Sequence, residues 1–263
     1  MITATFEQYP AADFARPETG PTMTRLTAVE LRKMVDTRAG FWLLAAGGLI
    51  GAAGVAIAVL PATASNPSLD SIFTSSSAAT RSLLALLGIL TVTSEWKQRT
   101  ALTTFTQVPV RGLVVTAKLA AAICLSGLFL LVSLLLALIG NLLVPALQQS
   151  GGNWSLPIAT LGAALLAGVL SAVMGVAFGM VLLNTAPAIV TYLLLPSIVA
   201  AVLALVPGLS TTGNWLSMSN VTGTALATHA GPETWAHLLA ASLLWVALPL
   251  VLGTWRMLHA EVK

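Results

Sequence analysis

The sequence predicts an all-α integral membrane protein with six transmembrane helices, and two features of its composition lead to this fold class. Of the 263 residues, 57% are hydrophobic and only 8% are charged, whereas a soluble domain carries roughly a quarter charged residues. From Leu119 through Pro232 the chain contains no Lys, Arg, Asp or Glu. Charged side chains keep a water-exposed surface soluble, so this uncharged run is expected to hold several membrane spans.

Six apolar windows are long enough to cross a bilayer, which takes about 20 mostly apolar residues per helix. They fall at about Ala39 to Leu60, Thr74 to Thr93, Lys118 to Val144, Pro157 to Leu183, Ala186 to Val206 and Trp235 to Trp255. An even number of spans places both termini on the same side of the membrane. We expect one six-helix domain over residues 24–263, preceded by a mobile cytoplasmic tail over residues 1–23.

The positions of Lys and Arg predict which side the termini face, because the cytoplasmic loops of membrane proteins are enriched in these residues. With a cytoplasmic N-terminus, the inner segments collect eleven cations, and the outer segments near residues 61–73, 145–156 and 207–234 collect none. The eleven are Arg16, Arg25, Arg32, Lys33, Arg38, Lys97, Arg99, Arg111, Lys118, Arg256 and Lys263. We therefore expect both termini in the cytoplasm.

Composition argues against several other classes of protein. The formal net charge is +3, but cations spread in this way form no basic stripe, so no nucleic-acid partner is expected. The single cysteine, Cys124, allows no intrachain disulfide and no Cys/His metal cluster, and we expect it to be a small core residue. No GxxxxGK[ST] motif occurs, so the chain is not expected to bind ATP through a P-loop of its own.

The stretch LTAVELRKMVDTR predicts a short helix over residues 27–37, ahead of the first span. Thr27 and Glu30 have the spacing of a capping box, and Leu26 with Leu31 has the spacing of a hydrophobic staple. One face of this helix is mainly apolar and the other carries most of the charges, which is typical of a helix lying in the membrane interface. An ordinary polar lead-in to a span remains the alternative.

Charge is concentrated in SEWKQRTALTTFTQVPVRG, residues 94–112, between the second and third spans. Leu102, Phe105 and Val108 recur every three residues, which places them on one side of a short helix, and Pro109 ends that helix. A simple positive-inside anchor needs only the cations, yet the segment also contains Glu95 and several threonines. We favour a docking surface for a cytoplasmic partner over a plain anchor.

Few polar residues interrupt the predicted spans. Arg81 is the one cation well inside a span window, and two interpretations are open: it snorkels to the outer headgroups, or it faces a cavity between subunits and contacts substrate or a partner. Asn141 offers a further polar group for a transport path or an interface. Small residues recur at four-residue spacing, at Gly47 and Gly51 and again at Ser171, Gly175 and Gly179. We favour tight packing within the bundle, with a subunit interface or a moving seam as the alternative.

Two of the connections between spans contain residues that predict their structure. The inner turn between the fourth and fifth spans is very short, with Pro187 suited to the start of a helix and Asn184 or Thr185 suited to cap it. The outer segment over residues 207–234 is too apolar for a free loop and too interrupted for a seventh span. We expect it to fold back on the protein or to enter the outer leaflet as a re-entrant loop.

These features together resemble the membrane subunit of type-2 ATP-binding-cassette transporters, the exporter-like permeases. The likeness covers about residues 24–255. EWKQRT at 95–100, VPVRG at 108–112 and Lys118 match the family pattern E-x-x-x-R-T … P-x-x-R … K after the second span. MGVAFGMVLLNTAPAI at 174–189 looks like the turn between the fourth and fifth spans of the family, and LTAVELRKMVDTR looks like its lead-in.

The resemblance implies a permease that exports a substrate across the plasma membrane of a bacterium. It would pair with a second permease subunit, identical or related, and with two separate ATPase subunits that bind ATP and magnesium, so the chain itself would hold no cofactor and would not be an enzyme. Segment 94–112 would contain the coupling helix, and residues 27–37 would form the elbow helix. The residues implied in ATPase coupling are Glu95, Lys97, Arg99, Thr100, Leu102, Thr103, Thr104, Phe105 and Arg111, with a second contact at Asn184 and Thr185. The chain departs from the family at Leu183, where a basic residue is common.

Two other functions are compatible with six spans. A self-sufficient channel or carrier would need charged or polar groups inside its spans, and such groups are scarce in this sequence. A membrane assembly subunit without transport would share the loop helix but would need no continuous cavity between subunits.

Overall fold

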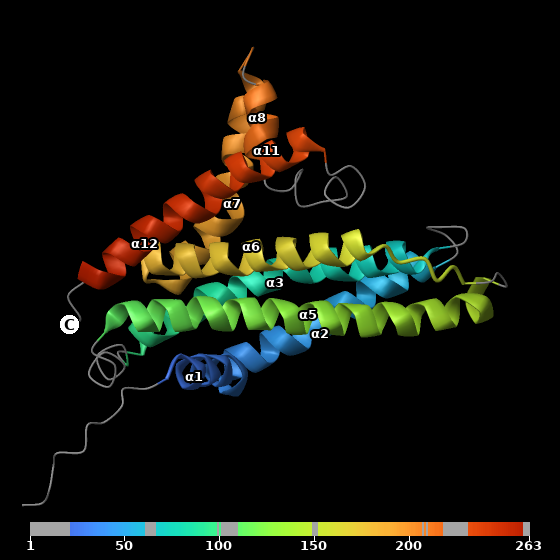
Figure 1. Cartoon of the computed structure of the whole chain (residues 1–263), viewed down its shortest axis with the longest axis horizontal. Coiled ribbons are helices and arrows are strands. Elements are labelled where there is room, and N and C mark those ends of the chain that lie inside the picture. The colour runs from blue at the N-terminus through green and yellow to red at the C-terminus, as the bar shows by residue number, and fades with distance from the viewer. Residues whose placement is uncertain are drawn as a thin grey trace, which may run out of the picture.

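The computed structural model describes residues 22–60, 67–98, 100, 110–148, 152–206, 208, 210–217 and 231–259, and nearly all of them lie in helices (Figure 1). Six helices are long and apolar enough to cross a membrane, which confirms the predicted all-α, multi-pass architecture. The elements are α1 (Met23–Asp36), α2 (Arg38–Val59), α3 (Leu69–Lys97), α5 (Arg111–Gln148), α6 (Ile158–Leu182), α7 (Thr185–Leu205), α8 (Ser210–Leu216), α11 (Pro232–Ser242), the π-helical turn η1 (Leu243–Ala247) and α12 (Leu248–His259).

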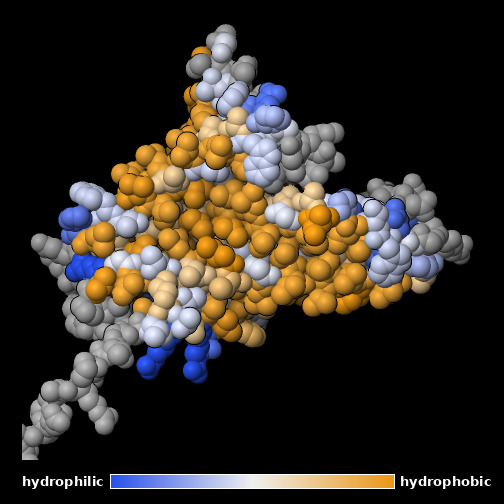
Figure 2. Space-filling model, in the orientation of Figure 1, coloured by the Kyte–Doolittle hydropathy of each residue, from blue (hydrophilic) through white to orange (hydrophobic). Residues whose placement is uncertain are grey.

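Helix α3 lies at the centre of the fold. It packs against α2, α5 and α6, and 61% of its most apolar window is buried, compared with 6% for α7. Figure 1 shows α2, α3, α5 and α6 running alongside one another, while α7, α8 and α11 rise away from them and α12 returns to the end of α6. Figure 2 shows the surface of this helical arrangement, with a broad apolar band over the middle of the molecule and polar groups gathered at its ends.

Two long helices approach each other closely where α3 meets α6. A Cβ atom added to Gly175 would stand 2.1 Å from the carbonyl oxygen of Ala85, and one added to Gly88 would stand 2.4 Å from that of Ala172. Both glycines therefore allow the two backbones to touch. The small-residue row that includes Gly175 and Gly179 thus serves packing within one chain, as its spacing predicts.

The Gly175→Ala variant is expected to be destabilised by about 1–3 kcal/mol, the usual cost of overpacking a tight interior. The added methyl group would meet the backbone of Ala85, which cannot rotate away as a flexible side chain does. Thermal unfolding in detergent measures the effect. Gly162→Ala in the same helix is the matched control, because a Cβ atom there meets nothing within 4 Å. Equal melting temperatures for the two variants would contradict the close α3–α6 contact.

The first helix begins earlier than the sequence predicts, and the predicted capping box is wrong. Helix α1 starts at Met23 with Thr22 as its N-cap residue, so Thr27 and Glu30 both lie inside the helix. The Thr27 hydroxyl donates a hydrogen bond of 2.9 Å to the carbonyl of Met23. Glu30 instead takes part in a buried charge network, described below. The interruption between the first two helices comes at Thr37, whose side chain accepts a hydrogen bond from the amide of Gly40 at 3.0 Å.

Cys124 is also placed differently from the prediction. It lies on the exposed side of α5 and is not a core residue. An apolar bilayer accepts a thiol on the lipid-facing side of a helix as readily as a core does, because both surroundings lack water. Hydropathy alone therefore does not separate these two positions.

The inner turn between α6 and α7 is formed by two residues. Leu183 adopts a left-handed conformation with φ of 51° at the end of α6, and Asn184 is the N-cap residue of α7 but makes no side-chain capping bond. The hydroxyl of Thr185, at the first position of α7, donates a hydrogen bond of 2.9 Å to the hydroxyl oxygen of Thr93 in α3. Asn184 therefore occupies the predicted cap position without a side-chain capping bond, and the Thr185 hydroxyl holds the turn to α3.

The outer segment is partly helical. Helix α8 packs against α7 and α11, the ring of Trp215 contacts the ring of His237 with centroids 4.1 Å apart, and the indole of Trp245 donates to the carbonyl of Leu216 at 2.8 Å. These contacts hold α8 against α7, α11 and η1. Residues 218–230 of the same segment lie outside the described residues.

Candidate functional site

Four charged side chains meet where α1, α3 and α5 come together. Glu30 and Lys33 lie on α1, Glu95 lies near the end of α3, and Lys118 lies in the second turn of α5. Each carboxylate lies between the two ammonium groups: Lys33 Nζ is 2.8 Å from Glu30 and 2.7 Å from Glu95, and Lys118 Nζ is 2.7 Å from Glu30 and 3.1 Å from Glu95. We call these four residues the basal charge network.

Lys118 is the most deeply buried member of the basal charge network. Its side chain is 0% exposed, and the side chains of Glu30 and Glu95 are 6% and 8% exposed. The ammonium group also donates to the carbonyl oxygen of Thr91 at 2.8 Å, so each of its three N–H groups has an acceptor. A buried charge is tolerated only when it is paired and hydrogen-bonded in this way.

Lys33 closes the network on the side nearer to water. Burial of its ammonium group acts to lower the pKa, but the carboxylates of Glu95 and Glu30 outweigh burial, and the pKa of Lys33 lies above its ordinary value of 10.5. A raised pKa means that this ion pair stabilises the fold fully below the ordinary pKa and is lost only as the pH rises through the higher, folded-state value. Lys33 is therefore charged throughout the physiological range.

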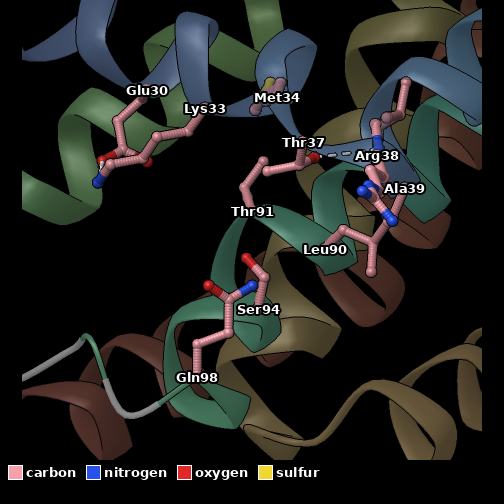
Figure 3. A pocket seen from close by; sticks show the side chains of 12 residues that line it. Glu30, Lys33, Met34, Thr37, Arg38, Ala39, Leu90, Thr91, Ser94 and Gln98 are labelled. Carbon is pink, nitrogen blue, oxygen red and sulfur yellow. Dashed lines mark hydrogen bonds and ion pairs between the residues drawn. The ribbon is translucent and has the colours of Figure 1, made fainter.

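A cavity of about 380 Å³ adjoins the basal charge network at the corner between α1 and α2. Figure 3 shows Glu30 and Lys33 beside one another on α1, with Thr91, Ser94 and Gln98 projecting from α3. Most of the remaining lining comes from the residues that turn the chain from α1 into α2. The network thus borders open space on one side and close packing with α5 on the other.

Segment 94–112 begins in the last turn of α3. The amide of Thr100 donates to the carbonyl of Glu95 at 3.0 Å and closes the last turn of the helix, and Lys97 is exposed on that turn. The predicted coupling residues Arg99, Leu102, Thr103, Thr104 and Phe105 lie outside the described residues. Of the remaining predicted residues, Glu95 alone joins the basal charge network.

Arg111, at the start of α5, contacts the other end of the chain. Its guanidinium donates to the carbonyl of Leu258 at 3.0 Å and lies 3.5 Å from that of Met257, both in the last turn of α12. Arg256 makes a similar bond to the carbonyl of Val181 near the end of α6. Cations at helix C-termini satisfy free carbonyls and offset the helix dipole. Arg111 therefore ties α5 to α12.

Arg81 and Asn141, the two polar residues predicted for a path or an interface, lie apart. Arg81 lies on the wall of a second cavity, of about 370 Å³, between α3, α6 and α7. Asn141 is buried in α5 beneath the backbone of Gly152, and within the described part of the chain neither of its amide atoms has a hydrogen-bond partner. The structure therefore does not join the two residues into one path.

Comparison with models of known families and with curated proteins finds no match for this chain. The likeness to ATP-binding-cassette permeases consequently rests on the sequence motifs already described. The described residues contain no group of three or more His, Cys, Asp and Glu side chains that could hold a metal ion.

The site residues predicted from the sequence include only Glu95 of the four network residues and only Arg81 of the lining of the second cavity. The spacing of Glu30 predicts a helix cap, and Lys33 counts only as an inner cation, because local spacing says nothing about partners far along the chain. Tyr192, which lines the cavity with Arg81, carried a usable signal. It is one of two tyrosines in the sequence and lies inside the uncharged run that begins at Leu119.

Proposed function

We propose that this chain is the permease subunit of an ATP-binding-cassette exporter in the plasma membrane of a bacterium, with both termini in the cytoplasm. It pairs with a second permease subunit and receives work from two separate ATPase subunits, which bind ATP and magnesium. The observation that carries the proposal is the basal charge network, which joins α1, α3 and α5 beside the segment proposed to contact the ATPase.

The network gives that segment a mechanical connection to three helices. Segment 94–112 includes the last turn of α3 and the first two residues of α5. Glu95 lies in that last turn, and Lys118 lies near the start of α5. Because both side chains are buried and bound to Glu30 or Lys33 of α1, a displacement of the segment moves the three helix ends as one unit. Work done by a partner on a short loop can be passed to membrane helices in this way.

The distribution of charge supports the orientation. The described cations other than Arg81 lie on α1, at the start of α2 and α5, at the end of α3, and at the end of α12. Helices α3, α5 and α12 bring these ends to one side of the molecule (Figure 1). A cluster of Lys and Arg at one end of the spans is typical of the cytoplasmic face, where ATP is available to a partner.

Affinity purification of the tagged chain from its native membrane tests the proposal. We expect an ATP-binding-cassette ATPase to copurify in about equal amount with the permease. Purification without any ATPase would contradict the proposal and favour a self-sufficient channel or carrier. ATP-dependent uptake by inside-out vesicles separates an exporter from a non-transporting assembly subunit, which would bind the ATPase without moving a substrate.

A further inference from the structure

The second cavity, of about 370 Å³, places a cation deep in the apolar part of the molecule. Helix α3 has 29 residues from Leu69 to Lys97, so its central residue is Leu83, and Arg81 lies two positions away. The distance from the start of the helix to Arg81 is about 18 Å at 1.5 Å per residue. Snorkelling is typical of Lys and Arg near helix ends, whereas a cation at mid-span marks a functional site by default.

We propose that this cavity binds the anionic head group of a membrane amphiphile, a carboxylate or a phosphate carried on an alkyl chain, with Arg81 as the cation that selects it. That the protein exports this amphiphile rests on the proposed function. The binding itself is a property of the single chain, because α3, α6, α7 and Ser217 all contribute to the wall.

The charge of the wall favours an anion. None of the described residues lining the cavity is acidic, and the sequence has no Asp or Glu between Leu119 and Pro232. Helices α5, α6 and α7 and the outer segment up to Pro232 therefore carry no carboxylate. An anionic ligand would supply the negative charge that these elements lack, and attraction between charges is strongest where water is scarce.

The shape and chemistry of the donors suit a carboxylate or a phosphate. A guanidinium offers its N–H groups in a planar fork that matches two oxygens of either group. Hydroxyl groups from three helices line the same cavity: Ser82 on α3, Ser171 on α6, and Tyr192 and Ser197 on α7. Hydroxyls donate readily to anionic oxygens. The wall thus combines one charged donor with several neutral ones.

The surroundings of the cavity favour an amphiphile over a soluble anion. Its volume is near the lower end of ligand pockets, which run from roughly 300 to 1,000 Å³, and suits a head group more than a whole lipid. Leu193 belongs to the wall and is 48% exposed. Val190, three residues earlier on the same side of α7, is 54% exposed and extends this apolar surface. An alkyl chain can lie along this surface while its head group contacts Arg81.

Native mass spectrometry of the full chain in a neutral detergent tests the site with paired probes. Dodecyl phosphate and laurate carry the anion, and dodecanol carries the same chain without charge. We expect both anions to bind the wild-type chain roughly 10- to 150-fold more tightly than dodecanol, the range that hydrogen bonds to a charged group imply. Tighter binding of dodecyl phosphate would identify phosphate as the preferred head group, and tighter binding of laurate would identify carboxylate.

The Arg81→Gln variant is expected to lose this preference, while Arg25→Gln, at an exposed position on α1, is expected to keep it. Equal binding of anions and dodecanol by the wild type, or an unchanged preference in Arg81→Gln, would overturn the proposal. The wild-type comparison decides the question even if Arg81→Gln does not fold. Because all these measurements use the chain alone, they are independent of whether an ATPase copurifies, so the site and the proposed function fail separately.

Discussion

Lys118→Met is expected to lower the free energy of unfolding by about 3–5 kcal/mol, the usual cost of removing one partner from a buried ion pair. The variant leaves Glu30 and Glu95, which are 6% and 8% exposed, with Lys33 as their remaining cation in the network. Methionine fills much of the volume of lysine, so the loss reflects uncompensated charge and not a cavity. Thermal unfolding of the purified chain in detergent measures the effect as a lower melting temperature.

Two further variants test whether the lower melting temperature comes from the basal charge network. Lys97→Met removes an exposed cation from the same end of α3 and is expected to leave the melting temperature nearly unchanged. Glu30→Gln combined with Lys118→Met is expected to recover part of the loss, because Lys33 can then pair with Glu95 alone. A melting temperature for Lys118→Met equal to that of Lys97→Met would show that the basal charge network does not stabilise the fold.

Glu95→Gln is expected to lower transport-linked ATPase activity by roughly 2- to 30-fold, which corresponds to a loss of 0.5–2 kcal/mol of coupling. The substitution keeps the size of the side chain but removes the charge that holds Lys33 of α1 and Lys118 of α5 to the end of α3. The complex with the ATPase is expected to assemble, because the helices themselves remain. Arg99→Ala is expected to act in the same direction.

The coupling measurement needs a control for the loss of any carboxylate. Glu233→Gln makes the same change at an exposed position in the first turn of α11, away from the basal charge network, and is expected to retain wild-type activity. Size-exclusion chromatography of each complex separates failed coupling from failed assembly. Wild-type ATPase coupling in both Glu95→Gln and Arg99→Ala would remove the mechanical role assigned to this end of α3.

The six spans could be predicted from the sequence because the bilayer imposes a length and a composition that a single window reveals. The ends of the helices could not be predicted as well. Helix α3 extends from Leu69 to Lys97, beyond the predicted Thr74 to Thr93 at both ends, because polar residues continue a helix once it has left the apolar core of the membrane. The π-helical turn over Leu243–Ala247 left no signal in the hydropathy pattern.

The candidate sites depend on contacts between distant residues, which a single sequence does not encode locally. Glu30 and Lys118 are 88 positions apart and meet at 2.7 Å. Arg81 could be identified as unusual from its position in a span, but its neighbour Tyr192 comes from another helix. Glu95 could be singled out as an acidic residue in a segment rich in cations, but its contacts with Lys33 and Lys118 come from two other helices.

Photocrosslinking from position 105 tests the central claim most directly. A photoreactive amino acid in place of Phe105 is activated in native membranes, and mass spectrometry identifies the polypeptide attached to it. A matched probe at Leu131, an exposed apolar position within α5, reports contacts inside the membrane. The account predicts an adduct with an ATP-binding-cassette ATPase from position 105 and none with that protein from position 131. The absence of an ATPase adduct from position 105 would contradict the proposal that this segment couples the permease to ATP hydrolysis.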